Sequence, residues 1–399
     1  MRCVVGIDDT DSSRGYCTTY LAYRIACDLG PDVRVVPYPR LVRLNPNIPF
    51  KTRGNAAVCL RVETKDPDLA FERIWAKVTE LSDVEGGANS GVVFLDDESM
   101  VSRFEPLYRD ALSGLVSPHR VRRFIREVGA RSLELGNGMG IVGAASSMGF
   151  DGRFDHTYEL ISYRRKEFWG TKRSIDSSSV VRMDAKTFPH TFNNYDYQKR
   201  KVLVAPHGPD PVFAGIRGDS PHAVIAAFGM LSCDEPLQGH MVYMSNQHTD
   251  AHFQGELKWK VFSSGWLDGT VERVSVGPGG HVYVSLMTPG GKRTAAAYEP
   301  TGDLRRTAKL LRPGDRIRAF GGVRRGTSLH PTILNMEKFE FVSLTRRGHP
   351  LRPGTYISSP RANRHLTKPL IRYGREDTRS EGAVEGWLES VPTRPLVHA

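Results

Sequence analysis

The chain has 399 residues, of which 25% are charged and 39% hydrophobic, and this composition excludes a largely disordered protein. The 55 lysines and arginines exceed the 44 acidic residues by 11 charges, which favours a polyanionic partner such as nucleic acid over a basic protein without one. The chain has no apolar run near the roughly 20 residues that span a bilayer and no basic segment leading into an apolar N-terminal core, so we expect a cytoplasmic protein without a membrane partner.

The first 150 residues or so alternate strand-like and helix-like segments, which predicts an α/β layer. A buried strand is expected at 3–5, and a helix is expected at 17–29, where Gly30-Pro31 stops it. Further strands are expected at 56–62 and 90–95, with a helix at 69–81 between them. Two helical stretches then lead to the glycine-rich segment 136–143.

The pattern of expected helices and strands changes after about residue 154. Strand-like runs at 158–163, 201–205 and 241–244, with a helix that begins near Pro221, predict a small α+β sandwich. From about 265 to 342, short strands separated by glycine-containing turns predict a small β-barrel. The last 50 residues or so are basic and rich in proline, which predicts an extended tail.

Three carboxylates, those of Asp8, Asp9 and Asp11, crowd a turn directly after the first strand. Carboxylates this close repel one another unless a cation shares their charge, and Mg²⁺ takes such oxygen ligands together with water and phosphate. The hydroxyls of Thr18 and Thr19 follow where a helix could present them to that phosphate. An acidic turn that only caps a helix is the alternative, and the spacing does not decide between the two.

A basic loop lies before the next strand, where Lys51 and Arg53 are closed by Gly54 and Asn55. Arginine offers phosphate a planar fork and lysine offers a point charge, so the pair could bind phosphate, although an isolated pair of this kind is more often a solvated loop. In the second region Asn194, Asp196, Arg217 and Asp250 fall in polar clusters that could line a small-molecule pocket or could simply stabilise turns.

Six segments of the sequence occur in an order that resembles the archaeal tRNA agmatinylcytidine (agmatidine) synthetase family. They are residues 6–21 (GIDDTDSSRGYCTTYL), 41–58 (LVRLNPNIPFKTRGNAAV), 215–220 (GIRGDS), 246–250 (NQHTD), 295–301 (AAAYEPT) and 361–374 (RANRHLTKPLIRYG). The resemblance covers nearly the whole chain. It implies an ATP-dependent ligase that joins agmatine to carbon 2 of the wobble cytidine in an isoleucine tRNA with a CAU anticodon, after phosphorylating the base.

The resemblance also implies an α+β multidomain fold: a kinase-like ATP-binding domain at 1–152, a ferredoxin-like domain at 153–260, an OB-fold at 261–344 and a basic tail at 345–399. It assigns catalytic roles to Asp8, Asp9, Asp11 and the autophosphorylated Thr18, with Mg²⁺ on Asp8 and Asp9. The residues that it implies for ATP are Lys51, Arg53, Gly54 and Asn55, and our candidates for the agmatine pocket that it implies are Asn194, Asp196, Arg217 and Asp250. For tRNA, the basic strip of the tail offers Arg361, Arg364, His365 and Lys368.

The sequence departs from the family between the barrel and the tail. The family has a zinc ribbon with two cysteine pairs there, whereas residues 345–350 contain no cysteine, and the five cysteines of the chain form no CxxC pair. We therefore expect no zinc. This departure favours an alternative, a non-catalytic or retargeted RNA-binding relative, against which the intact acidic and basic motifs count.

Overall fold

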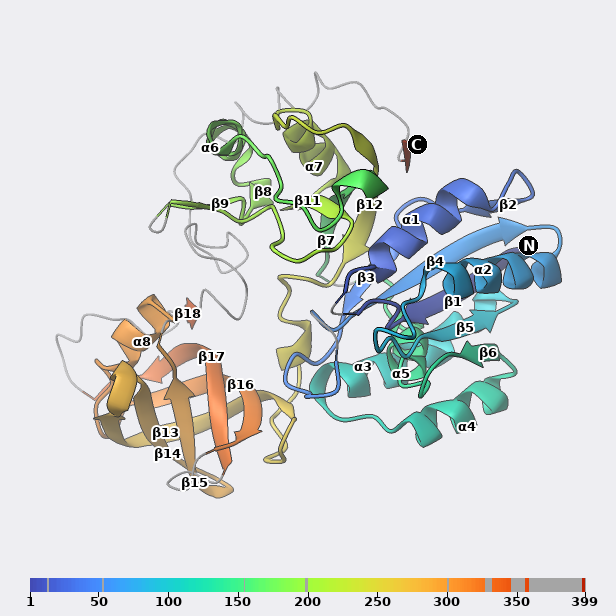
Figure 1. The fold of residues 1–399 in the computed structure, drawn as a ribbon. Coiled ribbons are helices and arrows are strands. Elements are labelled where there is room, and N and C mark those ends of the chain that lie inside the picture. The colour runs from blue at the N-terminus through green and yellow to red at the C-terminus, as the bar shows by residue number, and fades with distance from the viewer. Residues whose placement is uncertain are drawn as a thin grey trace.

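The computed structural model describes residues 1–12, 14–51, 54–153, 155–197, 200–299, 301–326 and 332–345, together with the backbone of 356–358 and 397–398. Figure 1 shows an N-terminal lobe in blue and cyan, a central lobe in green and yellow, and an orange barrel beside both. The structure is thus a mixed α+β assembly of several bodies, as the sequence predicts. In the described residues, no helix is both long enough and apolar enough to cross a membrane.

The N-terminal lobe is a sheet between two layers of helices. Its strands are β1 (Arg2–Asp8), β2 (Val33–Val35), β3 (Arg40–Arg43), β4 (Ala56–Thr64), β5 (Gly91–Leu95) and β6 (Arg131–Glu134). Its helices are α1 (Thr18–Asp28), α2 (Pro67–Leu81), α3 (Glu105–Ser113), α4 (Pro118–Val128) and α5 (Ile141–Met148). The helices expected at 17–29 and 69–81 are confirmed as α1 and α2.

Strand β1 is central in this lobe because both of its faces are apolar. Cys3, Val5 and Ile7 pack against α1 and α2, whereas Val4 packs against α3, α4 and α5. Gly6 lets α5 approach closely, since a Cβ at that position would lie 2.0 Å from the carbonyl oxygen of Ala144. The end of β1 is thereby fixed against the N-terminal half of α5.

The central lobe continues the same sheet. Its strands are β7 (Thr157–Arg164), β8 (Thr191–Phe192), β9 (Tyr195–Asp196), β10 (Lys201–Val202), β11 (Val212–Gly218) and β12 (Leu237–Ser245), and its helices are α6 (Ser177–Thr187) and α7 (Pro221–Phe228). In the described residues the order of the main sheet is β6-β5-β1-β4-β3-β12-β7-β11-β8. The two lobes meet where β3 and β12 pair in parallel, with Arg40 opposite Met244.

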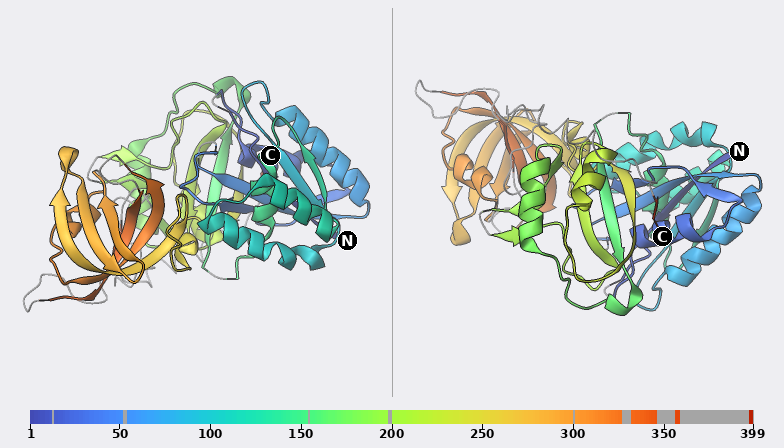
Figure 2. Two further views of the ribbon diagram at one scale, coloured as in Figure 1. Left: turned by 90° about the horizontal axis from the view of Figure 1, so that it is seen from below. Right: turned by 90° about the horizontal axis from the view of Figure 1, so that it is seen from above.

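The third body is a closed five-stranded barrel. Its strands are β13 (Ser264–Val276), β14 (Val282–Thr288), β15 (Gly291–Ala297), β16 (Arg316–Arg325) and β17 (Thr332–Ser343), with α8 (Asp303–Ala308) between β15 and β16. Parallel pairing of β15 with β17, where Ala295 lies opposite Leu334, closes the barrel. The expected small barrel is confirmed, and Figure 2 shows it beside the other two bodies from below and from above. Among the short strands near the chain end, β18 (Tyr356–Ser358) pairs with β17 and β19 (Val397–His398) pairs with β12.

Several elements were missed by the sequence patterns, among them α5, β11, β6 and α6, and the last two show why. Strand β6 is half-buried along its whole length and shows no clean alternation. Helix α6 begins with three serines, which are weak helix formers, but the side chain of Asp176 accepts hydrogen bonds from the amides of Ser178 and Ser179 and caps the helix. Burial of Val180 and Met183 then stabilises α6 through packing that no local pattern reveals.

Candidate active site

The acidic turn follows β1 directly and is fixed by buried contacts. Asp9 has a positive φ of 58°, and its carbonyl accepts hydrogen bonds from the amide of Asn89 and the hydroxyl of Ser90, both at 3.1 Å. Thr10 is fully buried, and its hydroxyl donates to that of Thr18 at 3.0 Å. The turn is therefore tied to the start of α1.

Asp8 lies against the first turn of α5. Helix α5 leaves room for its carboxylate because position 143 is glycine: a Cβ there would lie 1.8 Å from Asp8 Oδ2. Burial raises the pKa of Asp8 well above its usual range, and the charges of Asp9 and Asp11 raise it further. A bound cation would offset both the burial of this charge and its repulsion by the neighbouring carboxylates.

A second acidic residue, Asp83, organises the far side of the turn. It accepts a hydrogen bond from the hydroxyl of Ser12 and pairs with the guanidinium of Arg14. Arg14 and Ser12 lower the pKa of Asp83 to about 2. Asp83 therefore remains ionised and holds the turn, a role that no pattern in the sequence indicates.

Helix α1 presents its N-terminus beside the turn. Cys17 precedes the helix without a side-chain capping bond, and no acidic residue lies in the first turn. The first amides of a helix lack intrahelical partners and carry partial positive charge, so they attract anions. Thr18 places a hydroxyl at this end, which is a favourable position for receiving or contacting a phosphoryl group.

A cavity of about 590 Å³ lies between the N-terminal and central lobes. The N-terminal lobe contributes Asp11, Cys17, Thr18, Thr19, Leu41, Arg43, Gly54 and Ala56 to its lining. The central lobe contributes Glu159, Ile161, Leu203, Val204, Pro206, Gly208, Asp210, Val212, Gly215 and Arg217. The N-terminal end of α1 thus faces the strands β7 and β11 across the cavity.

The wall formed by the central lobe carries a buried ion pair. Glu159 Oε1 lies 2.9 Å from a terminal nitrogen of Arg217, and the two side chains are 5% and 13% exposed. Glu159 Oε2 and Arg217 Nε are buried without a hydrogen-bond partner. A buried acceptor and a buried donor without partners are costly, so this wall contains polar groups whose hydrogen bonds the fold leaves unmade.

Similar proteins identify the architecture. Residues 4–66 match the family model described as TiaS TCKD domain, and residues 138–252 match that described as TiaS FLD domain. The chain is 40% identical over 341 residues to the tRNA 2-agmatinylcytidine synthetase TiaS of Cenarchaeum symbiosum (strain A), an alignment that covers 84% of this chain and 76% of that protein. The chain belongs to this family.

Two further relatives align with this chain over almost their whole length. The Methanosarcina mazei TiaS is 35% identical, with 94% of this chain and 99% of that protein aligned. That alignment spans 434 positions, more than the 399 residues of this chain, so the Methanosarcina protein has residues without a counterpart here. The crystal structure of a complex of TiaS with an isoleucine tRNA, AMPCPP and agmatine matches with a TM-score of 0.82 and 34% identity, covering 95% of this chain and all of that one.

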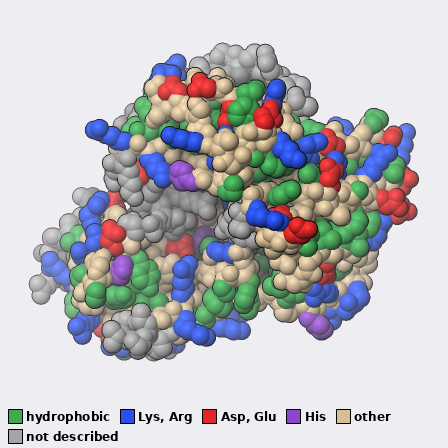
Figure 3. All heavy atoms as spheres, viewed as in Figure 1, with side chains coloured by type: hydrophobic (Ala, Val, Ile, Leu, Met, Phe, Trp, Pro, Cys, Tyr) green, Lys and Arg blue, Asp and Glu red, His purple; other side chains and the backbone are tan. Residues whose placement is uncertain are grey.

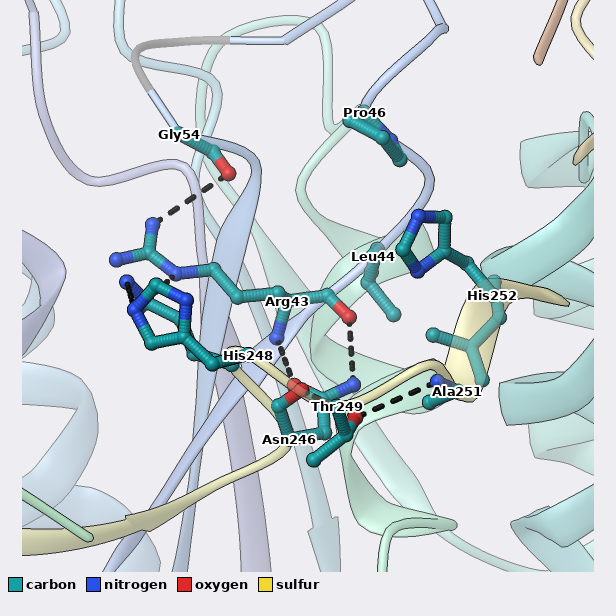
Figure 4. Close-up of a pocket in the computed structure, with 11 residues that line it drawn as sticks. Arg43, Leu44, Pro46, Gly54, Asn246, His248, Thr249, Ala251 and His252 are labelled. Carbon is teal, nitrogen blue, oxygen red and sulfur yellow. Dashed lines mark hydrogen bonds between the residues drawn. The ribbon is translucent and has the colours of Figure 1, made fainter. Parts of the chain in front are cut away.

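A smaller pocket of about 120 Å³ in this TiaS family member shares Arg43 and Gly54 with the large cavity. Figure 4 shows the Arg43 side chain reaching toward Gly54 and His248, with His252 on the other side of the pocket. Asn246 fixes the backbone of Arg43 from both sides, with hydrogen bonds of 2.7 Å to its amide and 2.8 Å to its carbonyl. Residues 246–249 of the NQHTD segment line this pocket.

The structure brings together only part of the predicted site. Asp11, Thr18, Gly54 and Arg217 line the large cavity, whereas Asp8, the last residue of β1, and Asp9, in the turn that follows, do not. Lys51 contacts the carbonyl of Pro46, and Asn55, with φ of 50°, donates to the carbonyl of Asn45 at 2.8 Å. Arg53 and the tail residues Arg361, Arg364, His365 and Lys368 lie outside the described residues.

Three residues predicted for agmatine do not line the large cavity. Asn194 is buried and donates to Asp184 at 3.1 Å, and Asp196 is buried in β9. Asp250 accepts a hydrogen bond of 2.7 Å from Lys338 of the barrel.

The cavity instead contains Glu159 and Asp210, which the sequence analysis did not select. The signal for Glu159 was a single acid inside the otherwise uncharged run 158–163, a place where a charge needs a partner. Asp210 lay in a proline-rich segment without any comparable signal.

The acidic turn does not by itself form a complete metal site. In the part of the chain that the structure describes, no group of three or more His, Cys, Asp and Glu side chains could hold a metal ion. Mg²⁺ does not require such a group, because it commonly takes one or two carboxylates and completes its shell with phosphate and water. The crowded carboxylates and the raised pKa of Asp8 fit a cation that arrives with a nucleotide.

Proposed function

We propose that this protein joins agmatine to carbon 2 of the wobble cytidine of an isoleucine tRNA with a CAU anticodon, with ATP as the energy source. The observation that carries the proposal is the large cavity, which places the N-terminus of α1, with Asp11 and Thr18, opposite the Glu159–Arg217 wall. One side suits phosphate and the other suits a cationic amine, so a base between them could be activated and then attacked.

The phosphate side comprises the acidic turn, α1 and the basic loop. Asp8 and Asp9 would hold Mg²⁺, which when bound neutralises the transferring phosphoryl group. The α1 amides and the Thr18 hydroxyl contact the phosphate chain, and Thr18 takes a phosphoryl group in the autophosphorylated form. Lys51, Gly54 and Asn55, together with Arg53, complete the ATP side.

The chemistry requires a leaving group on the base. Phosphorylation converts the 2-oxo group of cytidine into a phosphate ester, so that the amine nitrogen of agmatine forms a bond to carbon 2 while phosphate departs with the oxygen. The attacking amine must be unprotonated, and a nearby carboxylate can take its proton. We assign this role to Glu159, which lines the cavity.

Agmatine carries two positive charges, and three carboxylates line the cavity: Asp11, Glu159 and Asp210. We place agmatine against Glu159 and Asp210, with Arg217 directed to the phosphate on the activated base. In our proposal Asn194 and Asp196, which do not line the cavity, support this wall and do not contact agmatine. Asp250 joins the central lobe to the barrel through Lys338.

For the tRNA we propose an OB-fold at 261–344 as one contact and the basic tail at 345–399 as another, with the kinase-like and ferredoxin-like domains at 1–152 and 153–260. The closed barrel supports the OB-fold assignment. Arg318 lies 4.1 Å from the centre of the Trp266 ring, and Arg293 lies 4.8 Å from that of Trp259, which precedes the barrel. Such pairs suit stacked bases and phosphates. In Figure 3 basic side chains occur over all three parts of the face shown, interspersed with acidic ones.

The test is mass spectrometry of the wobble nucleoside after incubation of the protein with ATP, agmatine, Mg²⁺ and the unmodified tRNA transcript. The expected product has the mass of cytidine plus agmatine minus water. Asp9→Ala should abolish the adduct and leave tRNA affinity nearly unchanged, whereas Asp32→Ala, at an exposed turn, is the matched control.

The same experiment separates a second candidate, a non-catalytic or retargeted RNA-binding relative. The observation that favours it is the absence of cysteine from 345–350, where the family has its zinc ribbon. Bound tRNA without any adduct or ATP turnover would support that candidate and contradict the ligase. A parallel loss of tRNA binding in Asp9→Ala would show that the acidic turn is structural.

A further inference from the structure

The segment 206–212 forms part of the central wall of the large cavity, and most of it is neither helix nor strand. Pro206, Gly208, Asp210 and Val212 all line the cavity, and Asp210 is 4% exposed. Three of the seven residues are prolines, which have no amide hydrogen, so the segment can form few backbone bonds with itself. Something else must determine its shape.

That role falls to the side chain of Arg173, which lies behind the segment and is 6% exposed. Its Nε donates to the carbonyl of Val212 at 2.7 Å, and one terminal nitrogen donates to the carbonyls of Pro206 and Gly208, both at 2.9 Å. The other terminal nitrogen donates to the carbonyl of Asp210 at 2.9 Å and contacts its Oδ1 at 3.4 Å. One guanidinium thus bonds four carbonyls of one cavity wall.

Arg173 is itself held by a buried scaffold. Arg164 forms two hydrogen bonds with Glu235, at 2.7 and 2.6 Å, and both side chains are at most 5% exposed. Arg164 also donates to the carbonyl of Thr171 at 2.8 Å, and its amide donates to the carbonyl of Pro211 at the same distance. The chain leading to Arg173 and the segment that Arg173 binds are therefore anchored to one residue of β7.

The carboxylate of Asp210 receives its orientation from the same place. Its Oδ1 accepts the amide of Val212 at 3.1 Å in addition to the contact with Arg173. A lysine could not replace this arrangement, because it has three donors on a single atom, whereas the guanidinium has five in a planar fork.

We infer that Arg173 is a positioning residue that sets the shape of the 206–212 wall and the direction of Asp210, and thereby the selectivity of the enzyme for its amine substrate. The inference rests on the proposed function, since it assumes that this wall receives agmatine. Arg173 does not line the cavity, so it acts only through the segment that it binds. The phosphate side of the cavity belongs to the other lobe and should not depend on it.

The experiment compares Arg173→Lys with Arg182→Lys in the full protein with tRNA. Arg182 is a suitable control because it lies on α6, outside the lining of the cavity, and its side chain is 63% exposed. Arg173→Lys should raise the KM for agmatine about tenfold or more and should reduce the preference for agmatine over shorter and longer guanidino amines, as expected for a distorted specificity pocket. The KM for ATP and the ATP-dependent labelling of Thr18 should stay within about twofold.

A second variant keeps the test independent of folding. Asp210→Asn retains the carbonyls that Arg173 binds and should raise the KM for agmatine by itself. In the double variant, the increase in this KM should be smaller than the product of the two separate increases, because both changes act through Asp210. An unchanged KM for agmatine in Arg173→Lys, or an equal loss on the ATP side, would overturn the inference. Wild-type protein that forms no agmatine adduct would refute the proposed function and the inference together.

Discussion

The start of α1 is joined to the central lobe by two tyrosine hydroxyls, and their removal is the sharpest test of how the cavity is held together. Tyr163 on β7 and Tyr243 on β12 are fully buried. Both hydroxyls lie near the carbonyl oxygen of Thr19, at 2.9 and 2.6 Å respectively, and they lie 2.9 Å from each other. Burial raises the pKa of both tyrosines well above the usual range, so both remain protonated donors.

Two hydroxyls have two protons, but the geometry offers three contacts. Tyr243 makes the shorter contact with Thr19, so the Tyr163 proton can be directed either to Thr19 or to Tyr243. A single Tyr→Phe change at either position leaves one hydroxyl that can still donate to the carbonyl. We expect each single change to cost about 0.5–1.5 kcal/mol, the usual net value of one hydrogen bond.

The double change leaves no tyrosine hydroxyl at either position to bond Thr19. The expected loss therefore exceeds the sum of the single losses by about 0.5–1 kcal/mol, a coupling typical of groups in one network. The assay is the rate of the ATP-dependent labelling that we propose for Thr18, with urea unfolding measured in parallel. Tyr158→Phe, on the same strand, is the control. Strictly additive effects on both measurements would refute the reasoning, because they would show that the two hydroxyls do not share one acceptor.

Three further predictions concern residues outside the cavity lining. Gly143→Ala should lower ATP turnover at least about tenfold with little effect on tRNA affinity, because the new Cβ would lie 1.8 Å from Asp8 Oδ2 and displace it. Turnover assays and filter binding measure the two quantities. A variant with wild-type turnover would contradict the packing argument. Asp83→Asn should destabilise the protein at neutral pH, because the pKa of Asp83 is lowered to about 2 by its pairing with Arg14. Since a lowered acid pKa stabilises the fold above the unfolded value of about 3.9, thermal unfolding should show the difference from wild type shrinking as the pH falls from about 4 to about 2, and a constant difference would exclude the ion pair as its cause. Asn47→Ala removes hydrogen bonds to the barrel and should weaken the coupling of tRNA binding to ATP turnover. The measurement is the stimulation of the ATPase rate by tRNA. Unchanged stimulation would show that the coupling does not pass through Asn47.

The sequence was most informative where the chemistry is local. The acidic turn after β1, the start of α1 and the stop at Gly30 depend on residues within a few positions of one another, so their pattern could be recognised directly. The barrel was predictable for a similar reason, because its turns punctuate the sequence at regular intervals. The resemblance of six segments then indicated the family, which the relatives confirm.

The opposing wall of the cavity could not be predicted in this way. Glu159, Asp210 and Arg217 line the same cavity as Thr18 because β12 pairs with both β3 and β7 and so joins the strands of the two lobes into one sheet. No spacing in the sequence encodes that pairing, since it is decided by which apolar faces cover one another after the chain has folded. The same holds for Arg173, whose donors find four carbonyls on a proline-rich segment that is distant in the sequence.

The sequence by itself thus determined the local features of this protein, the acidic turn and the start of α1, because their groups are neighbours along the chain. Only the tertiary structure decided what faces them. Asn194, Asp196 and Asp250 were chosen as polar residues near expected strand ends, but the packing of the central lobe directs Glu159 and Asp210 into the cavity instead. The physical reason is that a charge in a strand or loop is oriented by long-range pairing and burial, which local sequence does not specify.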